Sequence, residues 1–111
     1  METEHREQRA GRNEALFREV NERVEEIARG SSSMFTEFTC ECSDTGCSAK
    51  VSLTLEEYES ARRSPTTFVV QPGHVQLDVE RVVGSEPGRY ELVEKLGEAG
   101  EVAAATDPRS R

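Results

Sequence analysis

Three cysteines lie within an eight-residue segment of this chain, and they constrain its fold more than any other feature. They are Cys40, Cys42 and Cys47, in the arrangement Cys-x-Cys-x4-Cys. The sequence has no apolar run long enough to span a bilayer, and its start lacks the apolar stretch of a signal peptide, so we expect a cytoplasmic protein with no membrane association. In a reducing compartment, an odd number of closely spaced cysteines indicates metal binding or reactive thiols before disulfides.

The spacing of the cysteines allows three thiolates to reach one ion. Side chains two residues apart leave the same face of a strand, so Cys40 and Cys42 point together while Glu41 points away. We predict strands at 35–40 and 49–53, joined into a hairpin by the turn at 43–46. Gly46 can take a positive φ without steric cost, which helps this turn to bring Cys47 back to the other two sulfurs.

A histidine on a second predicted turn completes a ligand set. Gln71-Pro72-Gly73-His74 has the proline and glycine of a type II turn, and the other histidine, His5, lies in the charged N-terminal segment. Three thiolates and one imidazole form a standard structural zinc site. We therefore predict that Cys40, Cys42, Cys47 and His74 bind Zn²⁺. Asp44 or a residue of a partner protein is an alternative fourth ligand, and metal-free reactive thiols are the alternative to zinc.

The shortage of core residues is the reason such a site would matter. Leu, Ile, Val and Phe make up 22 of 111 residues, and 16 of them fall between residues 35 and 96. A core of this size supplies roughly 3–5 kcal/mol, and a structural metal adds its binding energy to folding. We predict a charged N-terminal segment (1–30) with a helix at about 13–28, a linker (31–34), a zinc-stabilised α+β domain (35–96) and a C-terminal tail (97–111).

The N-terminal helix carries an apolar stripe at helical spacing. Its members are Leu16, Phe17, Val20, Val24 and Ile27. The opposite face carries acid-then-base pairs at i,i+4, among them Glu14 with Arg18 and Glu25 with Arg29. The stripe predicts docking onto the domain. Because part of it also fits a heptad seam, a homodimer or a partner-binding helix is the alternative.

The remaining elements follow from local signals. Thr54 and Glu57 have capping-box spacing, which predicts a central helix that ends before Pro65. A β-rich run follows at 66–70. Two more runs, at 79–84 and 89–95, predict a hairpin around 85–88, although Asp78 could instead cap a short helix. The fold class is α+β: a small antiparallel sheet of β-hairpins, an N-terminal amphipathic helix and one central helix. A short helix followed by a tail is expected after Leu96.

The charge of the chain excludes one class of partner. Its net charge is −8, and the pair Arg62–Arg63 is the only basic cluster of the domain. Since lysine and arginine supply most nucleic-acid affinity, we expect no nucleic-acid binding. The acidic surface or the N-terminal helix suits a protein partner, which favours an interaction or regulatory module.

Two further functions are weighed against that module. A thiol redox sensor needs an accessible thiolate of low pKa, and the acidic Glu37, Glu41 and Asp44 beside the cysteines argue against one. A cysteine- or metal-dependent enzyme, with Cys47, His74 and Asp78 as catalytic groups, has no accompanying phosphate loop or paired carboxylates. We therefore expect no enzyme.

Several motifs together resemble those of a family of small actinobacterial proteins with no assigned activity. The motifs are Phe38-Thr-Cys-Glu-Cys-x4-Cys47, Leu53-Thr-Leu-x-Glu-Tyr58, Phe68-Val-Val-x-Pro-Gly-His74 and Val93-Glu-Lys95. The resemblance covers residues from about 14 to 108 and implies that the three cysteines and His74 belong to one site. It implies a bacterial protein and suggests no reaction.

Overall fold

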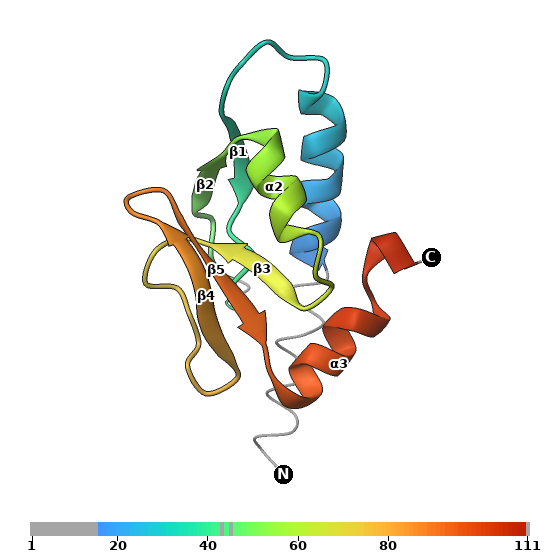
Figure 1. Ribbon diagram of the computed structural model, residues 1–111, viewed down its shortest axis with the longest axis vertical. Helices are drawn as coiled ribbons and strands as arrows, with labels where there is room; N and C mark the ends of the chain where they lie inside the picture. Colours follow the sequence, from blue (N-terminus) through green and yellow to red (C-terminus); the bar gives the residue numbers. More distant parts are fainter. Residues whose placement is uncertain (1–15, 43, 45, 111) are drawn as a thin grey trace.

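The computed structural model describes residues 16–42, 44 and 46–110, and it confirms the α+β class (Figure 1). A helix over residues 16–28 comes first in this part of the chain. It is followed by β1 (Thr36–Thr39), β2 (Lys50–Leu53), α2 (Leu55–Ala61), β3 (Thr67–Val70), β4 (Glu80–Glu86), β5 (Tyr90–Lys95), α3 (Gly97–Ala105) and a 3-10 turn (Pro108–Ser110). The helix over 16–28 and α2 lie side by side next to β1 and β2 (Figure 1).

The strands form two small antiparallel sheets. The predicted β1–β2 hairpin is confirmed, with Phe38 opposite Val51, although Ser43 and Thr45 of its predicted turn lie outside the described residues. The second sheet has the order β3-β5-β4. The chain leaving β1 runs along the outer edge of β3, where the Glu41 N–H donates to the Val69 carbonyl at 2.7 Å. This contact joins the two sheets at the cysteine segment.

The core lies on both faces of β3, whose four residues are all buried. Val69 belongs to one apolar cluster, in which the Phe38 and Tyr58 rings stack with centroids 4.4 Å apart. Phe68 and Val70 belong to the other cluster, together with Cys40 and Cys42. Alternate strand residues point to opposite faces, so β3 separates the two clusters. Cys40 and Cys42 are therefore part of the core.

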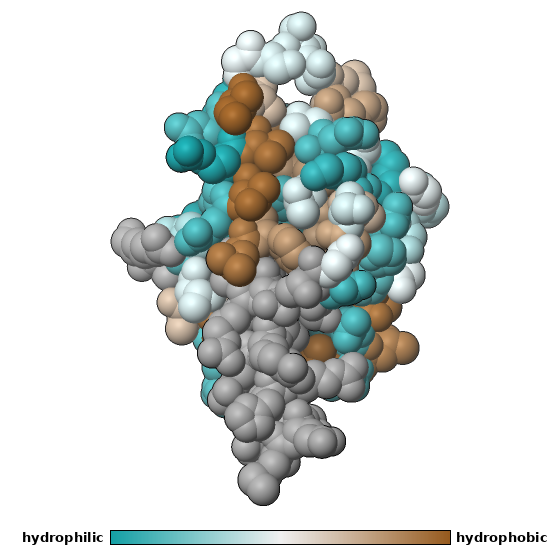
Figure 2. All heavy atoms as spheres, turned by 180° about the vertical axis from the view of Figure 1, so that it is seen from behind, coloured by the Kyte–Doolittle hydropathy of each residue, from teal (hydrophilic) through white to brown (hydrophobic). Residues whose placement is uncertain are grey.

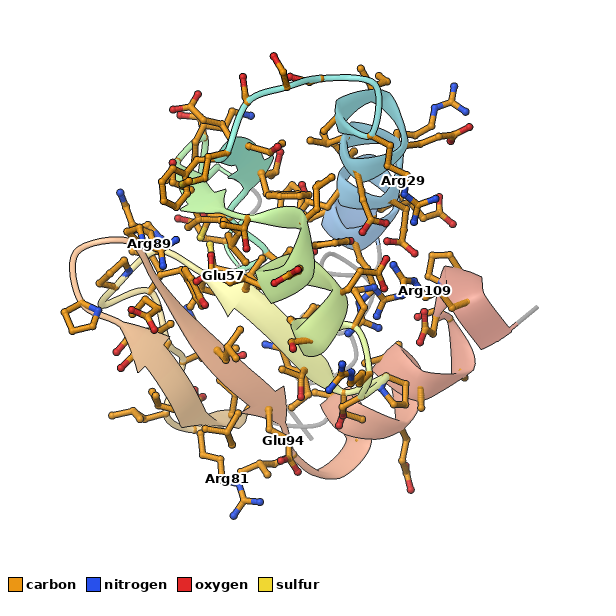
Figure 3. The ribbon with its side chains drawn as sticks, turned by 45° about the horizontal axis from the view of Figure 1, so that its top comes forward. Arg29, Glu57, Arg81, Arg89, Glu94 and Arg109 are labelled. Carbon is orange, nitrogen blue, oxygen red and sulfur yellow. The ribbon has the colours of Figure 1, made fainter. Side chains whose placement is uncertain are left out.

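Helix α2 forms as predicted. The Glu57 N–H donates to the Thr54 hydroxyl, and the Thr54 N–H donates to the Glu57 carboxylate, which completes the capping box. The Glu57 carboxylate also accepts from both terminal nitrogens of Arg89, at 2.8 and 2.6 Å (Figure 3). This ion pair ties the start of α2 to the β4–β5 turn.

The region after His74 forms the predicted hairpin, not a helix capped by Asp78. Its turn lies one residue later than predicted: the Arg89 N–H donates to the Glu86 carbonyl, and Gly88 has a φ of 79°. In its register Glu80 faces Lys95, and the two side chains form a fully buried ion pair. The next pair, Arg81 with Glu94, lies at the surface with 3.3 Å between charged atoms (Figure 3).

The short helix predicted after Leu96 forms as α3, and it packs on the domain. In α3, Ala99, Gly100 and Ala103 are buried. A Cβ on Gly100 would lie 2.8 Å from the Lys95 carbonyl oxygen, so only glycine allows this approach without a shift. Because small residues make the contact, a search for large apolar residues does not detect it.

The N-terminal helix forms as predicted over residues 16–28, while residues 13–15 of the predicted helix lie outside the described residues. The helix presents the face opposite to the predicted one to the domain. Leu16, Val20 and Ile27 are 64%, 48% and 77% exposed, whereas Arg18 and Asn21 are buried. The prediction that the apolar stripe docks on the domain is therefore wrong for these three residues. Val24 is partly buried and packs against the core.

Polar groups of the domain explain this orientation. The Arg18 guanidinium donates to the carbonyl oxygens of Pro65 and Thr67, both at 2.7 Å. The Asn21 amide pairs with the backbone of Thr39 in both directions, at 2.7 and 2.8 Å, as a neighbouring strand would. Since a buried backbone group without a partner is costly, the helix side chains satisfy groups that the short strands leave open.

Candidate metal centre

The segment after β1 places two cysteine side chains together. The Cys40 N–H donates to the Ala49 carbonyl at 3.0 Å, which extends the hairpin, and the Glu41 N–H bonds to β3. The side chain of Glu41 points into the protein and is 1% exposed. The predicted alternation of Cys40 and Cys42 against Glu41 is therefore confirmed, although the segment has left the strand.

Cys47 returns through a turn that Asp44 organises. The Asp44 carboxylate accepts from the Gly46 N–H at 2.9 Å, and the Asp44 carbonyl accepts from the Cys47 N–H at 3.0 Å. The Asp44 carboxylate is therefore engaged with the backbone of the turn. Asp44, the predicted alternative fourth ligand, does not belong to the ligand cluster that the described residues form.

His74 arrives from the loop between β3 and β4. The backbone N–H of His74 donates to the Gln71 carbonyl at 2.9 Å, and Gly73 has a φ of 88°, as the predicted type II turn requires. The Gly73 N–H donates to the Glu91 carboxylate at 2.9 Å, which anchors the turn to β5. The imidazole is thereby held at the cysteines.

The four predicted side chains come together in space. The ligand atoms of Cys40, Cys42, Cys47 and His74 all lie within 4.8 Å of one another. The His74 Nδ1 atom lies 3.5 Å from the Cys40 sulfur and 3.6 Å from the Cys47 sulfur. Zinc bonds of about 2.3 Å to sulfur and 2.0–2.1 Å to nitrogen, at a tetrahedral angle, separate the two atoms by about 3.6 Å. The cluster therefore has the dimensions of a metal site.

Hydrogen bonding prepares the first sulfur for a negative charge. The Gln71 N–H donates to the Cys40 sulfur at 3.2 Å. The hydrogen bond from Cys42 lowers the pKa of the Cys40 thiol despite burial, and the Gln71 N–H lowers it further. The hydrogen bond to Cys40 has the opposite effect on Cys42: together with burial, it raises the pKa of the Cys42 thiol. The acidic neighbours were expected to raise thiol pKa, yet the pKa of Cys40 is lowered, because the hydrogen bond from Cys42 outweighs burial.

Glu41 is the residue that sequence reasoning missed. Its carboxylate accepts from the Asn21 amide at 2.8 Å and from the Val69 N–H at 2.9 Å. Burial raises the pKa of Glu41, and the nearby Arg18 opposes that shift. Because Glu41 stands between two cysteines, it ties the metal loop to the N-terminal helix and β3. Its position beside the cysteines is the only signal that the sequence offered.

The cluster lies at the edge of the core and borders solvent on one side. Cys40 and Cys42 are at most 2% exposed, whereas Cys47 and His74 are partly exposed. A hollow of about 200 Å³ adjoins the cluster, lined in part by Cys42, His74 and Val75. All three thiols are free of disulfide bonds. An ion or a chelator thus has a route to the site.

The chain has no match among family models, curated proteins or solved structures from which a function could be inferred. Among the described residues, no helix is long and apolar enough to cross a membrane. Asp78, the third group of the alternative catalytic set, is not a member of the cluster formed by the described cysteines and His74.

Proposed function

We propose that this protein is a small zinc-stabilised interaction module of the cytoplasm, without catalytic activity. The observation that carries the proposal is the convergence of Cys40, Cys42, Cys47 and His74 to within 4.8 Å. These residues come from two segments, and a metal ion bound by all four would join the β1–β2 hairpin to the loop after β3. The metal then acts as a structural crosslink.

The ligand chemistry supports zinc. Three thiolates and one imidazole suit a borderline-soft tetrahedral cation, whereas Mg²⁺ and Ca²⁺ prefer oxygen ligands and an iron–sulfur cluster takes four cysteines. Four protein ligands close the coordination shell. Because no position stays open for water or substrate, such a site supplies stability and no Lewis-acid catalysis.

The metal also supports the proposed interaction surface. Glu41 lies between two of the ligands and accepts a hydrogen bond from Asn21 on the N-terminal helix. Fixing Cys40 and Cys42 on an ion therefore fixes Glu41, and Glu41 holds the helix that turns its apolar side to solvent. In this proposal zinc binding orients the surface that meets a protein partner.

A thiol redox sensor is the second candidate, because the pKa of Cys40 is lowered within a group of free thiols. Burial argues against it, since Cys40 is 0% exposed and a sensor thiolate must meet its oxidant. The two candidates differ in their response to reagents. A chelator unfolds the zinc module, whereas peroxide converts a metal-free sensor to a folded disulfide form.

Native mass spectrometry of the freshly purified full chain, with and without chelator, tests the proposal. We expect one zinc ion per chain and loss of circular dichroism when it is removed. His74→Ala should weaken zinc retention, whereas His74→Cys should keep one zinc in a four-cysteine site. His5→Ala is the matched control and should behave as the parent.

Two results would overturn the proposal. One is a folded parent protein that carries no metal after growth with zinc. The other is equal zinc retention in His74→Ala and His5→Ala. Because His74→Cys retains four ligands, its behaviour separates loss of a ligand from general damage to the loop.

A further inference from the structure

We propose that the N-terminal helix binds a second copy of this chain, with the two helices antiparallel across a two-fold axis. The contact surface is the outer stripe, defined as Leu16, Val20 and Ile27. This inference rests on the proposed interaction module and names its partner. It predicts a weak homodimer whose contact lies away from the metal.

The outer stripe is a continuous apolar surface along the exposed side of the helix. Figure 2 shows it as a brown column along the helix. Leu16, Val20 and Ile27 are 64%, 48% and 77% exposed, and they occupy one side of the helix at spacings of 4 and 7 residues. At 1.5 Å per residue the column is about 17 Å long. Contiguous exposed apolar surface of this kind marks a contact site.

The two sides of the stripe differ in chemistry. At 100° per residue, Glu19, Arg23 and Glu26 lie along one side, and all three are exposed. Phe17 and Val24 lie along the other side and are half-buried. A second helix packed on the stripe therefore meets a charged flank and an apolar flank.

Symmetry then selects the antiparallel arrangement. In an antiparallel pair related by a two-fold axis, each flank faces the same flank of the other copy, whereas a parallel pair sets the charged flank against the apolar one. A two-fold axis that crosses the exposed side of the helix at the level of Asn21 places Leu16 close to Ile27 of the second copy. It also places Arg23 within reach of Glu19 of the second copy, and symmetry makes this ion pair twice. The surface is complementary to itself.

The size of the surface sets the expected strength. A helix pair of this length falls at the small end of specific interfaces, which bury about 1,200 Å² or more in total. We therefore expect a reversible dimer with a dissociation constant on the order of 10 µM. Sedimentation should report the mass of a 12.4 kDa chain when dilute and twice that mass when concentrated.

The first test replaces one valine of the stripe in the zinc-loaded full chain. Val20→Glu should shift the dissociation constant upward at least about tenfold, because it places two like charges at the centre of an apolar contact. Val83→Glu is the matched control: Val83 lies on β4 and is 46% exposed, against 48% for Val20. It should dimerise as the parent does.

The second test reads the orientation through charge exchange. Arg23→Glu alone and Glu19→Arg alone should each weaken the dimer, because each homodimer then sets like charges opposite one another. An equimolar mixture of the two variants should dimerise again. In the mixed dimer the introduced glutamate of one chain faces the introduced arginine of the other, while the unaltered Glu19 faces the unaltered Arg23. Ion pairs within one helix cannot produce this rescue.

The outcomes separate this inference from the proposed function. A folded, zinc-loaded parent that stays monomeric at about 1 mM overturns the dimer and leaves the zinc module standing. Equal weakening by Val20→Glu and Val83→Glu, or no rescue in the mixture, overturns the antiparallel contact. A metal-free protein that still forms the Val20-dependent dimer supports the dimer and overturns the zinc module.

Discussion

Replacing Arg18 with alanine tests how the N-terminal helix is held on the domain. The guanidinium donates to the carbonyls of Pro65 and Thr67 at 2.7 Å each, and its central carbon lies 3.8 Å from the centroid of the Phe68 ring. Alanine reaches none of these groups. Both carbonyls lose their charged donor, and Thr67 lies in β3, whose residues stay buried.

The magnitude follows from these contacts. Hydrogen bonds to a charged group contribute about 1.5–3 kcal/mol each, and a desolvated cation–π contact about 2 kcal/mol. Part of this sum is offset in the native protein: Arg18 Nε has no hydrogen-bond partner among the described residues, and desolvation lowers the pKa of Arg18. We therefore expect Arg18→Ala to lower the free energy of unfolding by about 3 kcal/mol, well below the sum of these contributions.

Urea unfolding followed by circular dichroism measures this loss, at a dilution where the chain is monomeric and with zinc present. Arg18→Met should lose less, because its unbranched stem still covers Phe68. Arg63→Ala is the control, since Arg63 is exposed, and it should change stability by less than about 0.5 kcal/mol. If Arg18→Ala and Arg63→Ala unfold at the same urea concentration, the helix is not held by its polar face.

Two further predictions concern charge pairs of the domain. Glu80→Ala removes the carboxylate of the fully buried Glu80–Lys95 ion pair and should cost about 3–5 kcal/mol. Glu94→Ala, at the neighbouring surface pair with Arg81, should cost less than about 1 kcal/mol. Urea midpoints compare the two variants, and equal losses would contradict this prediction. The hydrogen bonds from Arg89 lower the pKa of Glu57 to about 2. The stability that this carboxylate contributes is therefore present above its ordinary pKa of 4.5 and is lost as the pH falls toward 2. Glu57→Gln should therefore be less stable than the parent near pH 7 and approach it near pH 2, and a difference independent of pH would contradict this assignment.

Much of the local structure was predictable because it depends on neighbours in the chain. The capping box of Thr54 and Glu57 starts α2, and the proline and glycine before His74 form the expected turn. The hairpins form where alternating β-rich runs flank turn residues. The β4–β5 turn lies one residue later in the structure than the prediction placed it, since strand pairing extends to Glu86 opposite Tyr90.

The members of the candidate site were also predictable, but their surroundings were not. Cysteine spacing and the turn before His74 place the four ligand atoms together. The hydrogen bond from the Gln71 N–H and the inward turn of Glu41 depend on β3, which lies far along the chain. No local pattern contains that partner, so the effect on the Cys40 thiol was missed.

The sequence alone determined the positions of the helices and strands, the capping box of α2 and the set of candidate metal ligands, because short-range geometry and residue chemistry decide them. Tertiary structure alone decided which face of the N-terminal helix meets the domain. Apolar periodicity favours burying Leu16 and Val20, yet the open carbonyls of Pro65 and Thr67 and the edge of β1 require donors that only Arg18 and its polar neighbours supply. The unmet hydrogen bonds of the domain outweigh the apolar stripe, and the stripe is left for another surface.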